Sequence, residues 1–98
     1  MNNFSFSLQI LTLGSDNSTI LKVVDQIIEK IKSSGLNYNV GPFETTVEGN
    51  AQECLKLLNE CILLSGDLYE DIFANIKIHY TKDKKVMTIE DKIKKHIK

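Results

Sequence analysis

The sequence predicts an α+β fold in which two helices cover one face of a four-stranded antiparallel sheet. Segments that alternate apolar and polar residues indicate strands, and segments that repeat apolar residues every three or four positions indicate helices. Their order reads strand, helix, strand twice over, and a short helix follows. With 98 residues, the chain is long enough for one hydrophobic core, so we expect a single domain over residues 1–98.

A change in the spacing of apolar residues predicts the first strand and the first helix. Residues 4–13 alternate apolar and polar side chains, which predicts a strand with one buried face. After the polar turn at residues 14–18, apolar residues recur at helical spacing as far as Ile31. This pattern predicts an amphipathic helix that ends near Ser34-Gly35.

A hairpin is expected next, from two short strands on either side of Gly41-Pro42. Residues 36–40 form the first strand, and the glycine-proline pair turns the chain. The second strand ends at Gly49. It is expected to alternate a buried set with an outward set: Phe43, Thr45 and Val47 against Glu44, Thr46 and Glu48.

The second long helix begins at Asn50, which stands three residues before Glu53 in a pattern that resembles a capping box. The helix is expected to end at Ser65-Gly66. It is apolar around more than one face, so a lone domain of this size should expose part of it, among Leu57, Leu64 and Cys61. We expect another subunit to cover that surface. Cys54 and Cys61 lie too far apart along one helix for a disulfide and are expected to be buried.

The last strand spans residues 72–80, and a lysine-rich turn follows it. Thr88, with Asp91 three residues later, opens a short helix that carries Ile89, Ile93 and Ile97. Two βαβ units in sequence favour the ferredoxin-like architecture, a βαββαβ sandwich with the first and third strands at the centre. The helices are then expected to cover Phe4, Phe6, Leu8, Ile10, Phe43, Thr45, Val47, Ala74, Ile76 and Ile78.

Composition excludes several classes of function. The formal net charge is −1 and every basic residue is lysine, so we expect no nucleic-acid partner. The N-terminus lacks a signal-peptide pattern and no apolar run reaches membrane-spanning length, so we expect a cytoplasmic protein without a membrane partner. No metal-ligand spacing and no nucleophile beside a base occurs, so we expect no metal, no catalytic residue and no resident cofactor.

The open face of the sheet is where a binding site is expected. Alternation places Gln9, Glu44, Thr46, Glu48 and Asn75 on this face, and two carboxylates on one central strand would favour a cationic or amine-bearing ligand. The alternative is that the sheet simply turns its polar residues to solvent. A surface ion pair of Lys77 with Glu48 or Glu44 fits both interpretations.

Two stretches resemble the thiamine-binding protein family, also described as a conserved uncharacterised family. They are residues 34–38 (Ser-Gly-Leu-Asn-Tyr), followed by residues 41–49 (Gly-Pro-Phe-Glu-Thr-Thr-Val-Glu-Gly). Residues 76–78 and 88–93 are similar too. The resemblance implies a ferredoxin-like fold, dimers or tetramers, and binding of thiamine or its hydroxymethylpyrimidine part without established catalysis. It supports Glu44, Thr46 and Glu48 as ligand-binding residues.

The leading hypothesis is therefore a non-catalytic, homo-oligomeric protein that binds thiamine or hydroxymethylpyrimidine on the open face or at a subunit interface. A single domain copy would need a partner subunit to enclose a pocket. The alternative is a homodimeric or homotetrameric interaction module that has no small-molecule ligand. An acylphosphatase-like enzyme is disfavoured because the chain lacks arginine, and RNA binding is disfavoured because Phe73 is the sole aromatic candidate on the open face.

Overall fold

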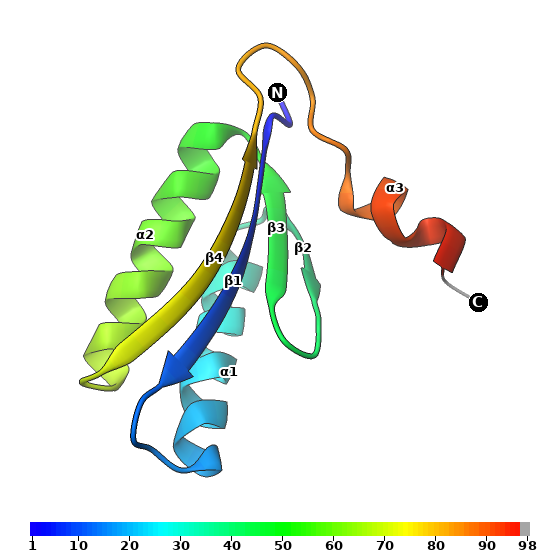
Figure 1. Ribbon diagram of the computed structural model, residues 1–98. Coiled ribbons are helices and arrows are strands. Elements are labelled where there is room, and N and C mark those ends of the chain that lie inside the picture. The colour runs from blue at the N-terminus through cyan, green and yellow to red at the C-terminus, as the bar shows by residue number, and fades with distance from the viewer. Residues whose placement is uncertain (97–98) are drawn as a thin grey trace.

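The computed structural model describes residues 1–96, and the chain folds into four strands and three helices there (Figure 1). A 3₁₀ turn over Lys94–His96 follows the last helix. In chain order the elements are β1 (Phe4–Thr12), α1 (Asn17–Ser33), β2 (Asn37–Val40), β3 (Thr45–Gly49), α2 (Ala51–Leu68), β4 (Ile72–Tyr80) and α3 (Ile89–Ile93).

The strands form one antiparallel sheet in the order β2-β3-β1-β4, which confirms the predicted topology and the central position of β1 and β3. β1 pairs with β4 along its whole length, from Phe4 opposite Tyr80 to Thr12 opposite Ile72. Its pairing with β3 runs from Phe4 to Leu8, because β3 is shorter. The first half of β1 is therefore paired with a strand on each side.

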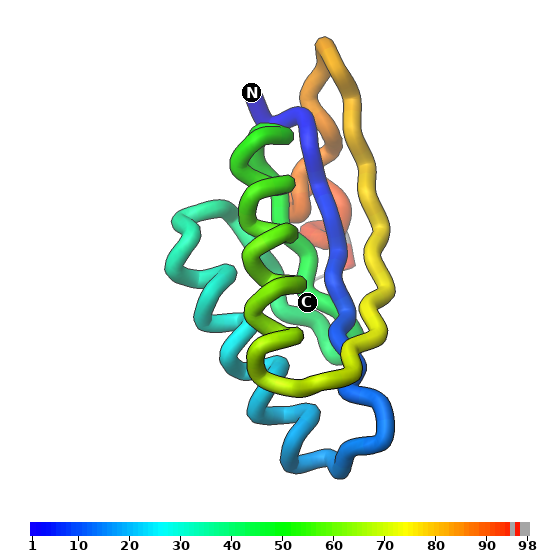
Figure 2. The backbone as a smooth tube through the Cα atoms, turned by 90° about the vertical axis from the view of Figure 1, so that its left-hand side faces the viewer, coloured from blue at the N-terminus to red at the C-terminus, as the bar shows by residue number. Residues whose placement is uncertain are grey.

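The two long helices lie side by side over one face of the sheet, and the core lies between the two layers (Figure 2). β1 presents alternate residues to this core, as its period-two pattern predicts. The Asn50–Glu53 capping box is formed, with the Asn50 Oδ1 accepting from the Glu53 amide at 2.8 Å. Buried core residues include Phe4, Phe6, Leu8, Ile10, Val23, Ile27, Ile31, Val47, Cys54, Leu57, Leu58 and Cys61. No helix in this part of the chain is long and apolar enough to cross a membrane.

The hairpin turn is longer than the sequence predicts, and the assignment of Phe43 to the core is wrong. The amide of Gly41 donates to the carbonyl of Glu44 at 2.9 Å, which closes a tight turn over residues 41–44. β3 consequently begins at Thr45. Phe43 lies on the turn with 79% of its surface exposed, and Glu44 stands at the end of the hairpin, not in mid-strand.

The outer edge of the molecule differs from the prediction in α2 and β4. α2 continues past Ser65-Gly66 to Leu68, because glycine there adopts ordinary helical geometry and not the positive φ of a helix stop. Leu57 and Cys61 are buried, so the apolar surplus of α2 is carried by other residues. Ile76 and Ile78 are 37% and 54% exposed, since β4 is an edge strand that the helices cover incompletely.

The C-terminal segment turns back and packs on the face of the sheet opposite to α1 and α2 (Figure 1). Val86 and Ile89 are its buried anchors, at 3% and 7% exposure. The amide of Val86 donates to the carbonyl of Asn2 at 2.9 Å. Thr88 caps α3 as expected, accepting from the amide of Asp91 at 3.0 Å. Ile97, expected in the same helix, lies outside the described residues.

Candidate functional site

A polar hollow of about 250 Å³ lies on the open face, between the sheet and the C-terminal segment. We call it the open-face hollow. Its volume is below the range of roughly 300–1,000 Å³ that is usual for small-ligand pockets. It is lined by Ser5, Phe6, Ser7, Glu44, Thr46, Lys77, Ile78, His79 and Lys92.

The floor of the hollow follows from two small residues on a central strand. Ser5 and Ser7 point away from the core because Phe4 and Phe6 point into it. In the sheet, Ser7 stands opposite Thr46 on β3 and opposite Lys77 on β4. Two serines between longer side chains leave a depression, and hydroxyl groups lie at its base.

The hydroxyl of Ser7 is buried and has no hydrogen-bond partner. Ser7 as a whole is 6% exposed. A buried hydroxyl without a partner costs about 1–3 kcal/mol of stability relative to a satisfied one, and most buried polar groups in folded proteins are satisfied. The unpartnered oxygen therefore marks this floor as a place where a donor or acceptor from a ligand would gain a bond that the protein does not supply.

An ion pair crosses the hollow. The Nζ of Lys77 lies 3.3 Å from the Oε1 of Glu44. Glu44 belongs to the hairpin beside β3, Lys77 belongs to β4, and β1 lies between them. The pair must therefore pass over β1 close to Ser7. The side chain of Lys77 is 79% exposed and that of Glu44 is 34% exposed. The pair therefore contributes at most about 1 kcal/mol to stability and opens easily.

Glu48 lies on the open face as expected, but its carboxylate is buried at 5% exposure. One oxygen accepts from the Nδ2 of Asn37 at 2.6 Å, and the other accepts from the amide of Ile89 at 2.9 Å. The second bond fixes the first residue of α3 to β3. In this structure Glu48 therefore holds the C-terminal segment in place and does not line the hollow.

Gln9 and Asn75 face each other on the same side of the sheet, each two residues along its strand from the Ser7–Lys77 pair. The Nδ2 of Asn75 donates to the Oε1 of Gln9 at 3.0 Å. This bond joins β1 to β4 outside the open-face hollow. Gln9 instead lines a neighbouring groove of about 290 Å³ between the hairpin turn and α1, and Glu44 borders both spaces.

Of the five residues that the sequence singles out, Glu44 and Thr46 are brought together in the hollow, and Gln9, Glu48 and Asn75 are not. The alternation of β1 and β4 also puts Ser7 and His79 on this face, and Lys77 was expected there only as a partner of Glu48 or Glu44. Sequence reasoning missed Lys92 there altogether, because the return of the C-terminal segment across the sheet has no local sequence signal. The small serines on a central strand are the signal that could have located the hollow.

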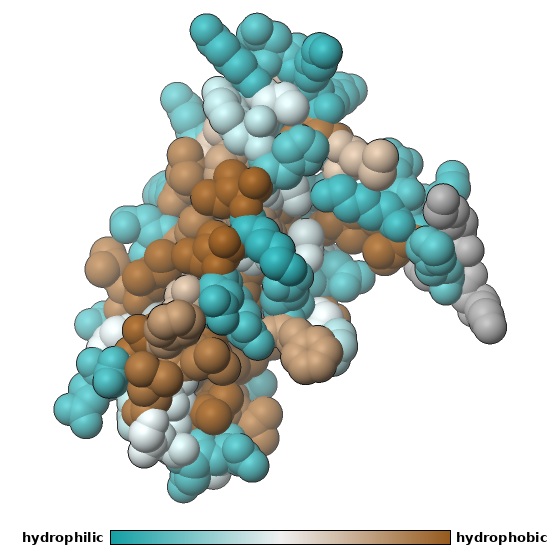
Figure 3. All heavy atoms as spheres, viewed as in Figure 1, coloured by the Kyte–Doolittle hydropathy of each residue, from teal (hydrophilic) through white to brown (hydrophobic). Residues whose placement is uncertain are grey.

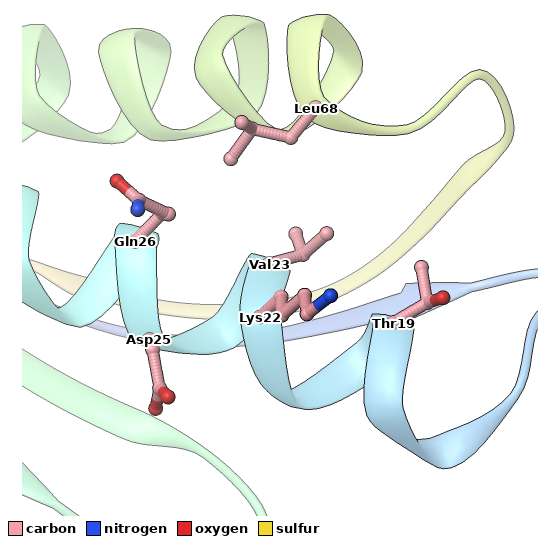
Figure 4. A pocket seen from close by; sticks show the side chains of 6 residues that line it. All are labelled: Thr19, Lys22, Val23, Asp25, Gln26 and Leu68. Atoms are coloured by element: carbon pink, nitrogen blue, oxygen red, sulfur yellow. The ribbon is translucent and has the colours of Figure 1, made fainter.

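A larger cavity of about 410 Å³ lies on the other side of the molecule, between α1 and α2 (Figure 4). Thr19, Lys22 and Gln26 of α1 and Leu68 of α2 line it, while the side chain of Asp25 points away from α2. None of its lining side chains, all of them described, carries a buried polar atom without a partner. The cavity is a groove between two helices, and we favour the open-face hollow as the site.

Apolar side chains gather over α2 and β4 on the outside of the molecule (Figure 3). They join the exposed side of α2 to the uncovered part of the edge strand. We call this surface the α2–β4 patch. It consists of Leu55, Ile62, Ile76, Ile78 and Tyr80, which are between 37% and 54% exposed.

Comparison with known proteins gives consistent relatives over nearly the whole chain. The model of the family described as thiamine-binding protein matches residues 6–97. A UPF0045 protein of Clostridium perfringens is 34% identical over 100 residues, which covers 98% of this chain and 99% of that protein.

Two solved structures are also similar. A Thermotoga maritima protein, provisionally described as a thiamine biosynthesis/salvage protein, superposes with a TM-score of 0.84 at 28% identity and covers 97% of this chain and 99% of its own. A domain of unknown function from Bacillus cereus gives a TM-score of 0.81 at 30% identity, covering 98% of this chain and 91% of its own.

Proposed function

Because the chain belongs to the thiamine-binding protein family, we propose that it binds thiamine or its hydroxymethylpyrimidine part in the open-face hollow, without catalysis. The observation that carries this proposal is the buried, unpartnered hydroxyl of Ser7 in the floor of the hollow. The family supports the class of ligand, and the geometry of the hollow supports the proposed position.

The groups around the hollow suit an aminopyrimidine. Its amine can donate to the Glu44 carboxylate or to the Thr46 hydroxyl, and a ring nitrogen can accept from the Ser7 hydroxyl. The positively charged thiazolium ring of thiamine would gain from the Glu44 carboxylate as well. Glu48 supports the site indirectly, because it fixes the segment that carries Lys92.

Calorimetric titration with thiamine and with hydroxymethylpyrimidine tests the proposal. Thr46→Val removes one hydroxyl from the hollow at nearly constant shape, and we expect it to weaken binding by about three- to ten-fold, the usual value of one hydrogen bond. Thr19→Val is the matched control, because Thr19 lines the groove between the helices. Absence of saturable binding of both compounds at millimolar concentration would reject the proposal, as would weakening by the control alone.

We propose also that the chain self-associates through the α2–β4 patch. β4 is a nine-residue strand at the edge of the sheet, and apolar side chains flank it. A long apolar edge is a template for another strand, and an antiparallel pair of identical strands closes with two-fold symmetry. A second copy of the chain would therefore pair with the free backbone groups of β4 and cover the apolar side chains of the patch.

The mass of the protein in solution tests this second proposal. Ile78→Lys places a charge at the middle of the patch, and we expect it to lower the measured mass to that of one chain. Val40→Lys is the control, because Val40 is similarly exposed, at 49% against 54%, on the other edge strand. A single-chain mass for the unaltered protein, or an equal effect of both changes, would contradict the assignment of this surface.

A further inference from the structure

We propose that the ligand of the open-face hollow is bipolar, an aminopyrimidine that carries a phosphate ester, and that its two ends replace the ion pair of Glu44 with Lys77. The amine would take the Glu44 carboxylate and the phosphate would take the Lys77 ammonium group. This inference rests on the proposed function, because it assigns the form of ligand that the same site prefers.

The first reason is the position of the ion pair. Lys77 stands directly opposite Ser7 in the sheet, and Lys77, Glu44 and Ser7 all line the same hollow. A ligand that binds the Ser7 hydroxyl would therefore lie next to the ion pair and compete for its two charged groups. An uncharged ligand would leave the lysine without its partner, whereas a ligand with an amine at one end and an anion at the other supplies a new partner to each.

The second reason is the distribution of charge around the hollow. Glu44 is the one carboxylate among its lining residues, all of which the structure describes. β4 contributes Lys77 and His79 on the far side of β1 from the hairpin, and α3, which packs on β3, contributes Lys92. An ammonium group that binds a phosphate forms charge-assisted hydrogen bonds, which are stronger than those between neutral groups. The β4 side of the hollow therefore suits an anion, while the hairpin side suits a donor.

The third reason is the role of the C-terminal segment. Glu48 binds the amide of Ile89, and Val86 and Ile89 are buried against the open face. These contacts fix α3 where Lys92 reaches the hollow. A buried carboxylate that holds a lysine-bearing helix at the border of a polar hollow fits a site for an anionic group.

Calorimetric titration of the full chain with matched compounds tests the inference. The compounds are hydroxymethylpyrimidine, its phosphate ester, thiamine, thiamine monophosphate and inorganic phosphate. We expect each ester to bind at least about ten-fold more tightly than its unphosphorylated counterpart, a factor that corresponds to about 1.4 kcal/mol. The preference should shrink as salt concentration rises.

Lys77→Met provides the decisive variant, because the side chain is exposed and its replacement should not disturb folding. We expect it to abolish most of the preference for esters. Because Glu44 then has no competing partner, we also expect the unphosphorylated compounds to bind more tightly. Lys32→Met, an exposed lysine of α1 on the other side of the sheet, should change neither.

Each outcome decides between the hypotheses. Equal affinity for esters and unphosphorylated compounds would overturn the inference and leave the proposed function standing. A preference that survives Lys77→Met, or binding of inorganic phosphate as tightly as the esters, would overturn it too. If none of the organic compounds binds, the proposed function fails together with the inference. The compound that binds most tightly shows whether the preferred ligand is the phosphate ester of hydroxymethylpyrimidine or that of thiamine.

Discussion

Ser7→Ala should separate stability from ligand binding, because the hydroxyl of Ser7 has no partner in the ligand-free protein. Most substitutions in a buried position reduce stability. This one removes a polar atom whose burial costs about 1–3 kcal/mol, and it leaves a space no larger than one oxygen atom. Since the lost packing offsets part of the gain, we expect the free energy of unfolding to stay constant or to rise by up to about 1 kcal/mol.

Urea unfolding of the ligand-free protein measures this change, and Ser5→Ala is the matched control on the same face of the same strand. Its hydroxyl is not among the buried atoms that lack a partner, so we expect little change in stability. With thiamine or hydroxymethylpyrimidine in excess, the unaltered protein should become more stable than Ser7→Ala. Ligand stabilises the unaltered protein in proportion to its affinity, and Ser7→Ala should lose about ten-fold in affinity. A loss of more than about 1 kcal/mol without ligand, or unchanged affinity, would refute the reasoning.

Three further predictions concern the segments around the site. Glu48→Ala should release α3, because a backbone amide loses its acceptor at a cost of about 1–3 kcal/mol; amide hydrogen exchange should then quicken in residues 86–93, and slow exchange there would contradict this role. Cys54 and Cys61 should resist iodoacetamide at pH 8 until the protein is unfolded, because burial raises the pKa of both thiols to about 11 and little thiolate forms; rapid labelling of the native protein would oppose this. Phe6→Ala should cost about 3–5 kcal/mol in urea unfolding, whereas Phe43→Ala should cost less than about 0.5 kcal/mol because the ring is exposed; equal losses would show that Phe43 packs elsewhere.

The sheet and its helices were predictable because their signals are local. The alternation of Phe4, Phe6, Leu8 and Ile10 gives β1 its buried face, and the structure confirms it. The family resemblance is confirmed as well. The turn at Gly41 was harder, because one hydrogen bond to Glu44 decides where β3 begins and removes two residues from the strand pattern.

The candidate site was only partly predictable, because its geometry depends on contacts between distant segments. Glu48 is 41 positions from Ile89 in sequence, and the bond between them converts an expected ligand-binding carboxylate into an anchor for α3. The pairing of Glu44 with Lys77, in contrast, was one of two partners foreseen for that lysine. Alternation can assign a residue to a face, but it does not show which other segment covers that face.

The position of the ligand is the central claim, and amide chemical shifts during a titration test it most directly. We predict that thiamine or hydroxymethylpyrimidine shifts the amides of Ser7, Thr46 and Lys77, together with those of α3, in a saturable manner. The contradictory result is a set of shifts confined to the groove between the helices, at Thr19, Gln26 and their neighbours, with the open face unchanged.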